Sequence, residues 1–172
     1  MKKRVWGALI CLVALLAFAS CGADEGGKNP KEQAEQGTVL GQAANGGYWL
    51  KVGGSEIHVG ALLPELPAAD STFSAESCAI KGLDKTYTYG SVVISTEDDG
   101  TEERVVGMTI LDDGAATEEG LTIGDTAEKA KSLYGTPTEE TGTALRYAKD
   151  GMVLKILLRD GSVTSIVYEL AK

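Results

Sequence analysis

The chain has 172 residues, a formal net charge of −9, an apolar content of 43% and 22 glycines. This length allows one domain together with an export segment and a tether. Without residues 1–20, 13 basic residues stand against 25 acidic ones, so the rest of the chain has a net charge of −12. A surface this negative repels phosphate backbones and anionic head groups, so nucleic acid is excluded as an expected partner.

The first 21 residues have the pattern of a bacterial lipoprotein signal. Three basic residues, 2–4, precede an apolar run of 14 residues, 5–18. A membrane-spanning helix needs about 20 apolar residues, so this run fits the apolar region of a signal peptide instead. Small residues follow it, directly before Cys21. The segment 18–21, Phe-Ala-Ser-Cys, resembles the bacterial lipobox. The resemblance implies that a diacylglyceryl group is attached to Cys21 and that the chain is cleaved before it.

The expected consequence is a lipoprotein on the extracytoplasmic face of the cell membrane, with the lipid bilayer as partner. Two acyl chains, such as palmitate, hold a protein firmly where one chain does so only marginally. The alternative is an ordinary cleaved secretory signal in which Cys21 is incidental. Residues 21–46 are rich in Gly, Ala, Gln, Asn, Glu and Lys and show no helical or strand period, which predicts a flexible tether. The domain is therefore expected at residues 47–172.

The second half of this domain has the clearest elements. Asp125 is expected to cap a helix, with Glu128 as the other half of a capping box and Gly135 at its end. Three antiparallel strands are expected next, over residues 143–148, 152–159 and 163–170, because apolar residues alternate along them. Asp160-Gly161 is a strong hairpin signal between the last two strands.

An internal repeat relates the two halves of the domain. Residues 57–60 parallel 121–124, residues 87–89 parallel 145–147, and residues 105, 108 and 110 parallel 163, 166 and 168. The first helix is degenerate because of Pro67. A hairpin over residues 48–59, turning at Gly53-Gly54, is expected to add edge strands. The pattern predicts an α+β fold of two tandem helix-plus-antiparallel-meander repeats, about 47–112 and 118–170, with the helices on one face of the sheet.

A family resemblance supports the same expectation. Residues 121–168 contain Ile-Gly-Asp-Thr, then Tyr-Gly-Thr-Pro, a tyrosine strand and a final Val-x-x-Ile strand. This order resembles the SmpA/OmlA lipoproteins of outer-membrane assembly, and the tandem form resembles the β-lactamase-inhibitor-protein fold. The resemblance implies an envelope assembly factor or a protein inhibitor. Two departures are the single domain cysteine, Cys78, where the inhibitors have a disulfide in each repeat, and the small number of aromatic residues.

The residues that could carry chemistry do not form a recognisable catalytic set. His58 is the only histidine and lies in an alternating strand, where it is expected to face the surface. Cys78 is either a buried, inert thiol, which is the favoured interpretation, or a redox or intermolecular site. The acidic clusters do not match an EF-hand loop and are interpreted as solvated turns, with weak cation binding as the alternative. No catalytic residue, metal or cofactor is therefore expected.

The tyrosines are the remaining candidates for recognition. Tyr87 and Tyr89 share one face of a strand, and Tyr147 is the repeat counterpart of Tyr89. This row is either an interaction surface or core packing between helix and sheet. The leading hypothesis for the whole chain is a binding or protein-interaction module, with an envelope protein as the candidate partner, and not an enzyme. The alternatives are the assembly factor or inhibitor and, less favoured, a hydrolase that uses two carboxylates.

Overall fold

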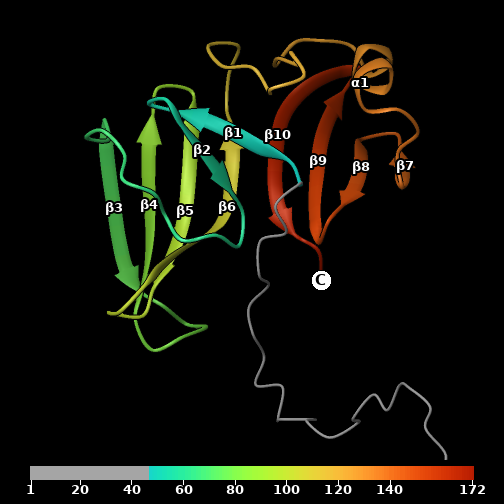
Figure 1. Cartoon of the computed structure of the whole chain (residues 1–172). Helices are drawn as coiled ribbons and strands as arrows, with labels where there is room; N and C mark the ends of the chain where they lie inside the picture. The colour runs from blue at the N-terminus through green and yellow to red at the C-terminus, as the bar shows by residue number, and fades with distance from the viewer. Residues whose placement is uncertain (1–46) are drawn as a thin grey trace, which may run out of the picture. The chain divides into compact units, whose positions relative to one another are not determined.

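The computed structural model describes residues 47–172 (Figure 1). The predicted signal peptide at 1–20, the lipidation site Cys21 and the tether at 21–46 lie outside the described residues. The described part contains ten strands and one α-helix.

Eight of the strands form a single antiparallel sheet in the order β3-β4-β5-β6-β10-β9-β8-β7 (Figure 1). It consists of two four-stranded meanders that meet where β6 pairs with β10. The first meander contains β3 (Ser71–Glu76), β4 (Leu83–Tyr89), β5 (Val92–Asp98) and β6 (Glu103–Ile110). The second contains β7 (Glu139–Thr141), β8 (Ala144–Lys149), β9 (Met152–Arg159) and β10 (Ser162–Leu170).

The three predicted strands of the second half are confirmed, and their turns explain the register. Asp150 and Gly151 have φ angles of 49° and 76°, and Asp160 and Gly161 have φ angles of 51° and 78°. Two successive residues at positive φ are what a two-residue hairpin turn requires, and the Asp-Gly pair adopts this conformation at low cost. The turns fix the pairing of β8 with β9 and of β9 with β10, which places Leu145, Tyr147, Leu154, Ile156, Ile166 and Tyr168 on one face.

That face is the core face of the sheet. Two elements contribute to its cover: the hairpin of β1 (Trp49–Val52) and β2 (Ser55–His58), and the helix α1 (Ala127–Tyr134). The hairpin turns at Gly53 and Gly54 as predicted, but it forms a separate two-stranded sheet instead of adding edge strands. Together the hairpin, the helix and the sheet enclose one apolar cluster, whose fully buried members include Ile57, Val59, Ile94, Val105, Met108, Ile110, Leu121, Ala130, Leu145, Leu154, Ile156, Ile166 and Tyr168.

The two halves are related by a pseudo-two-fold axis at the pairing of β6 with β10. Met108 pairs with Tyr168 and Ile110 pairs with Ile166. The repeat equates Met108 with Ile166 and Ile110 with Tyr168, so exchanging the two halves maps this pairing onto itself. The axis therefore passes through the middle of the eight-stranded sheet.

The backbone outside the sheet repeats the same symmetry. Gly60 donates from its amide to the Val105 carbonyl at 2.7 Å, and Gly124 donates to the Val163 carbonyl at 2.8 Å. Each valine donates in return, to Ala61 at 2.9 Å and to Asp125 at 2.8 Å. A register shift also follows each valine, so that one extra residue is inserted at 106 and at the equivalent position 164.

The predicted α+β fold with a helix in both repeats is nevertheless wrong. The described domain is mostly β, with one helix of eight residues in its second half only. In the first half, residues 60–63 pair with the beginning of β6 instead of forming a helix, and Pro64 and Pro67 lie in the extended segment that follows. Proline cannot donate a helical hydrogen bond, which disfavours a helix in this segment. The β1–β2 hairpin contributes to the cover of the core where a first helix was expected.

The cap of the one helix also differs from the prediction. Thr126 is the N-cap, and its hydroxyl accepts a hydrogen bond from the amide of Lys129 at 3.2 Å. Asp125 lies one residue earlier, where its carboxylate accepts from the Thr122 amide and from Lys129 Nζ, both within 2.8 Å. The sequence alone did not distinguish Thr126 from Asp125 as the N-cap, because Asp and Thr are both good capping residues. The predicted end at Gly135 is confirmed.

Two tyrosines give a test of the core: Tyr168 of β10, which is buried, and Tyr134, the partly buried last residue of α1. The Tyr168 hydroxyl is buried without a hydrogen-bond partner among the described residues, whereas the Tyr134 hydroxyl lies 2.7 Å from Glu119 Oε2 and 2.6 Å from Thr117 Oγ1. An unsatisfied buried hydroxyl costs roughly 1–3 kcal/mol. We expect Tyr168→Phe to raise the free energy of unfolding by about 1 kcal/mol, and Tyr134→Phe to lower it by about 1–2 kcal/mol. Urea unfolding of both variants measures this, and a loss of stability in Tyr168→Phe would contradict the assignment.

Candidate functional site

The candidate site lies on the face of the sheet opposite the core. Residues that alternate with buried ones along each strand point to this face, so it carries Arg146 between two buried neighbours on β8 and Lys155 between two on β9. Glu139 of β7 and Glu169 of β10 lie on the same face, because they pair with Arg146 and Val153. These side chains are all partly or fully exposed.

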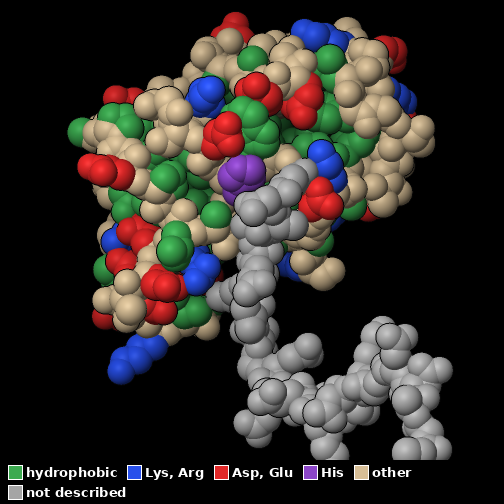
Figure 2. Space-filling view, viewed as in Figure 1, with side chains coloured by type: hydrophobic (Ala, Val, Ile, Leu, Met, Phe, Trp, Pro, Cys, Tyr) green, Lys and Arg blue, Asp and Glu red, His purple; other side chains and the backbone are tan. Residues whose placement is uncertain are grey.

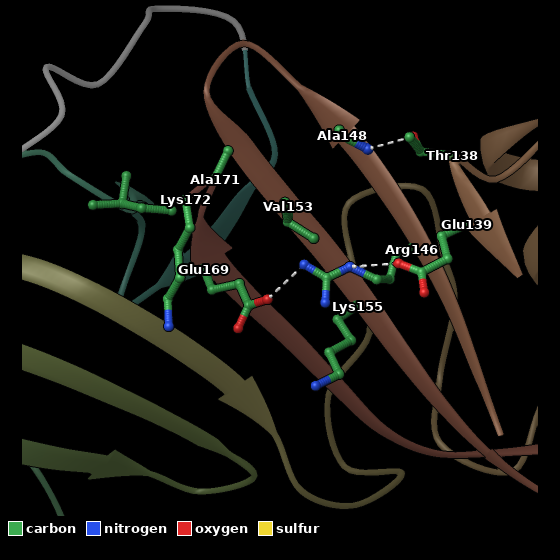
Figure 3. Close-up of a pocket in the computed structure, with 10 residues that line it drawn as sticks. Thr138, Glu139, Arg146, Ala148, Val153, Lys155, Glu169, Ala171 and Lys172 are labelled. Carbon is green, nitrogen blue, oxygen red and sulfur yellow. Dashed lines mark hydrogen bonds and ion pairs between the residues drawn. The ribbon is translucent and has the colours of Figure 1, made fainter. Parts of the chain in front are cut away.

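A groove of about 470 Å³ crosses this face (Figure 3). Its floor contains the short apolar side chains of Ala148 and Val153, and charged side chains stand around it. The sequence supplies this combination because β8 and β9 place small or β-branched residues beside long charged ones on the same face. The complete lining is Thr138, Glu139, Arg146, Ala148, Val153, Lys155, Glu169, Leu170, Ala171 and Lys172.

Arg146 is the centre of the charged side chains in the groove. Its guanidinium lies 3.3 Å from Glu169 Oε1 and 3.6 Å from Glu139 Oε2, and Figure 3 shows it between these two carboxylates. The three side chains come from three strands, β10, β8 and β7. The ion pairs therefore hold Arg146 in one orientation across the groove.

Lys155 differs from Arg146 because it has no ion-pair partner among the described residues. It lies directly opposite Arg146 in the pairing of β8 with β9. Like charges in such a position destabilise a sheet, by up to about 1 kcal/mol. Residues 47–172 contain 21 acidic and 11 basic residues, so an uncompensated lysine beside an arginine is unusual for this surface. The arrangement presents an ammonium group to an incoming anion.

A second polar cluster lies on the first meander, and its charged side chains are paired with one another. Lys85 lies 2.5 Å from Asp98 and 3.1 Å from Glu103, and Glu103 also accepts from Tyr87 and Thr96. Burial acts to raise the pKa of Glu103, but the hydrogen bonds from Thr96, Tyr87 and Lys85 outweigh it and hold that pKa below its ordinary value. The hydrogen bond to Asp98 in turn raises the pKa of Lys85. We interpret this cluster as structural.

The tyrosine row lies on the core face, which agrees with core packing, the favoured one of its two interpretations, and not with an interaction surface. Tyr147 is 3% exposed, and Tyr87 and Tyr89 are partly buried against the same core, so the row packs the sheet. The repeat correspondence also changes. Tyr87 pairs with Ile94, and Tyr147 pairs with Leu154. In each hairpin this is the second core-facing pair, counted from the turn. Tyr147 is therefore the counterpart of Tyr87 and not of Tyr89.

The other candidate residues show no joint site. Cys78 is exposed in the loop between β3 and β4, so the prediction of a buried thiol is wrong. His58 is partly exposed, stacks beside Trp49 with ring centroids 6.4 Å apart, and lies 3.9 Å from Glu56. It is the purple side chain in Figure 2.

The acidic turns hold their own backbone. Asp98, Asp99 and Asp112 each accept hydrogen bonds from amides two or three residues later, which is the solvated-turn interpretation of these clusters. Among residues 47–172, no group of three or more His, Cys, Asp or Glu side chains is placed to hold a metal ion.

Comparisons with models of protein families, with curated proteins and with solved structures find no match to this chain. The resemblance to the SmpA/OmlA lipoproteins and to the β-lactamase-inhibitor-protein fold therefore stays a prediction from short motifs. None of the helices in the described part of the chain has the length and apolar character needed to cross a membrane.

The sequence prediction did not include the groove, although a signal for it was present. Arg146 lies between Leu145 and Tyr147, and Lys155 lies between Leu154 and Ile156. Because side chains alternate along a strand, each cation points to the face opposite its apolar neighbours. The pairing that brings these two cations together follows from the Asp150-Gly151 turn.

Proposed function

We propose that this chain is a lipid-anchored, extracytoplasmic binding module that recognises its ligand through the groove on the open face of the sheet. The observation that carries the proposal is the Arg146–Lys155 pair, in which Lys155 has no carboxylate partner among the described residues. The ligand class we propose is a molecule with a carboxylate group, and a polypeptide with a free carboxyl terminus is the form that we would test first.

The electrostatic setting supports a selective site for an anionic group. The domain is acidic overall, so its surface in general repels anions in solution. Within the groove the balance differs, because Arg146 and Lys155 stand against two carboxylates and both carboxylates pair with Arg146, which leaves Lys155 without an ion pair. A carboxylate can accept a charge-assisted hydrogen bond from Lys155, while Ala148 and Val153 receive the apolar part of the ligand.

The same geometry favours binding over hydrolysis. A glycoside hydrolase of the usual type needs one carboxyl group that protonates the substrate and a second that attacks or activates water. Glu139 and Glu169, the two carboxylates of the groove, both lie within 3.6 Å of the Arg146 guanidinium. Both carboxylates are therefore paired with one cation of the groove, and this arrangement does not separate them into the two roles that hydrolysis requires.

A matched pair of peptides tests the proposal. The chain is purified in detergent from bacterial membranes, and a fluorescent tripeptide is titrated as the free acid and as the C-terminal amide. We expect the acid to bind more tightly, and Lys155→Gln to weaken its binding about tenfold or more, because a hydrogen bond to a charged group contributes roughly 1.5–3 kcal/mol.

Lys51→Gln is the control, because Lys51 is an exposed cation on β1 and does not line the groove. It removes the same charge, so it separates a local contact from a change in net charge. Equal binding of the acid and the amide, or equal losses in Lys155→Gln and Lys51→Gln, would contradict a carboxylate site at Lys155.

A further inference from the structure

Strand β3 is an open edge of the eight-stranded sheet. It pairs with β4 on one side and ends the strand order on the other. All six of its residues are exposed, and Phe73 is 68% exposed. The opposite edge, β7, has only three residues. Proteins usually protect a long edge with Lys, Pro or a bulge, and β3, Ser-Thr-Phe-Ser-Ala-Glu, has none of these.

The pairing with β4 shows which backbone groups of this edge are available. Ser77 donates from its amide to the Gly82 carbonyl at 3.0 Å, next to the pair Glu76–Leu83. Hydrogen-bonded pairs alternate in an antiparallel ladder, so Ser77, Ala75 and Phe73 direct their amides toward β4. The amides and carbonyls of Thr72, Ser74 and Glu76 then point away from the sheet, where a further strand would pair with them.

The charge around the edge decides which strand would fit. Asp70 and Glu76 stand at the two ends of β3, and Asp84 lies opposite Ala75. Residues 47–114 contain 12 acidic and four basic residues, and one of the four, Lys85, is held by Asp98 and Glu103. Figure 2 shows acidic side chains outnumbering basic ones on the side of the molecule that carries β3 and β4. A second copy of this chain would bring two such acidic surfaces together, which opposes self-pairing.

We propose that the β3 edge binds an extended, lysine- or arginine-containing segment of another polypeptide, which adds to the sheet as a ninth strand. Main-chain hydrogen bonds to Thr72, Ser74 and Glu76 would hold the segment, and its cations would lie near Glu76, on the face of the sheet opposite Phe73. Phe73 supplies an apolar contact for alternate side chains of the added strand. This surface is separate from the groove at Lys155, so the inference goes beyond the proposed function and does not depend on it.

The test uses the full chain in detergent and three synthetic peptides of eight residues. The probe alternates lysine and valine, the second peptide alternates glutamate and valine, and the third keeps the lysines but replaces each valine with proline. The third peptide has the charge of the probe but cannot form a strand. We expect the probe to bind at least tenfold more tightly than either control. In hydrogen exchange measured by mass spectrometry, we expect it to slow exchange in residues 71–77.

Two variants locate the site. Ser74→Pro removes an amide that points away from the sheet and should abolish protection of β3 by the probe. Glu76→Lys leaves the backbone intact and should weaken binding several-fold, which keeps the test decisive if Ser74→Pro unfolds. Equal binding of the lysine–proline peptide would show a purely electrostatic contact, and protection confined to segments other than 71–77 would place the site elsewhere. Either result, or no binding of the probe, overturns the proposal.

Discussion

Replacing Cys21 with alanine (C21A) should abolish lipid attachment completely. Cys21 follows a 14-residue apolar run and two small residues, and its thiol is the group to which the proposed diacylglyceryl anchor is joined. Two acyl chains anchor a protein far more firmly than one. Bacteria that express the chain are fed an alkyne analogue of palmitate, and we expect a labelled protein from the native sequence and an unlabelled one from C21A.

Cys78→Ala is the matched control, because it removes an exposed thiol of the domain and leaves the segment around Cys21 intact. It should incorporate the same amount of label as the native chain. If the native chain is cleaved after Ser20 or earlier without taking up label, the segment is an ordinary secretory signal. Label retained in C21A would place the acyl group on another residue.

Leu154→Ala should remove a large part of the stability of the domain. Leu154 is fully buried in the middle of β9, between Tyr147 of β8 and Tyr168 of β10. Truncating a buried leucine costs about 2–5 kcal/mol, because apolar contact is lost and a cavity remains. A domain of this size is stabilised by only about 5–15 kcal/mol, so the urea midpoint should fall sharply.

Leu157→Ala is the control on the same strand. Leu157 points to the open face and is only partly buried, so the same truncation should cost less than about 1 kcal/mol. Equal shifts of the urea midpoint in the two variants would contradict the division into a core face and an open face. The assignment of the groove at Lys155 to the open face depends on the same division, so this measurement also tests the basis of the candidate site.

The second half of the domain was predictable because its signals are local. The Asp-Gly turns require positive φ at two successive residues, and the alternation in β9 and β10 has a period of two, so strand limits and faces follow from neighbouring residues. The first half has the same sheet topology but weaker signals. Its segment 60–70 is held by hydrogen bonds from Gly60 and Leu63 to Val105 and Glu103 of β6, which lie 45 and 40 residues later in the sequence. Local patterns do not contain such long-range pairs, and the helix expected there was wrong.

The candidate site was missed for a related reason. Tyrosines were chosen as recognition residues because of their chemistry, but whether Tyr147 faces ligand or core depends on which side of the sheet the helix and hairpin cover. Tyr147 stacks on Tyr134 of α1 with ring centroids 5.3 Å apart, so the cover lies on its side. Once that side is known, the cations of β8 and β9 must lie on the other. The charge pattern was in the sequence, but its meaning depended on tertiary packing.

The position of β10 sets an order of events for the folding of the domain. This last strand pairs with β9, its neighbour in sequence, and with β6, which ends more than 50 residues before it begins. Until β10 emerges, β6 is paired only with β5 along residues 107–110, and the core between the halves stays open. In this architecture, closure of the sheet waits for a strand that is synthesised after every other described strand.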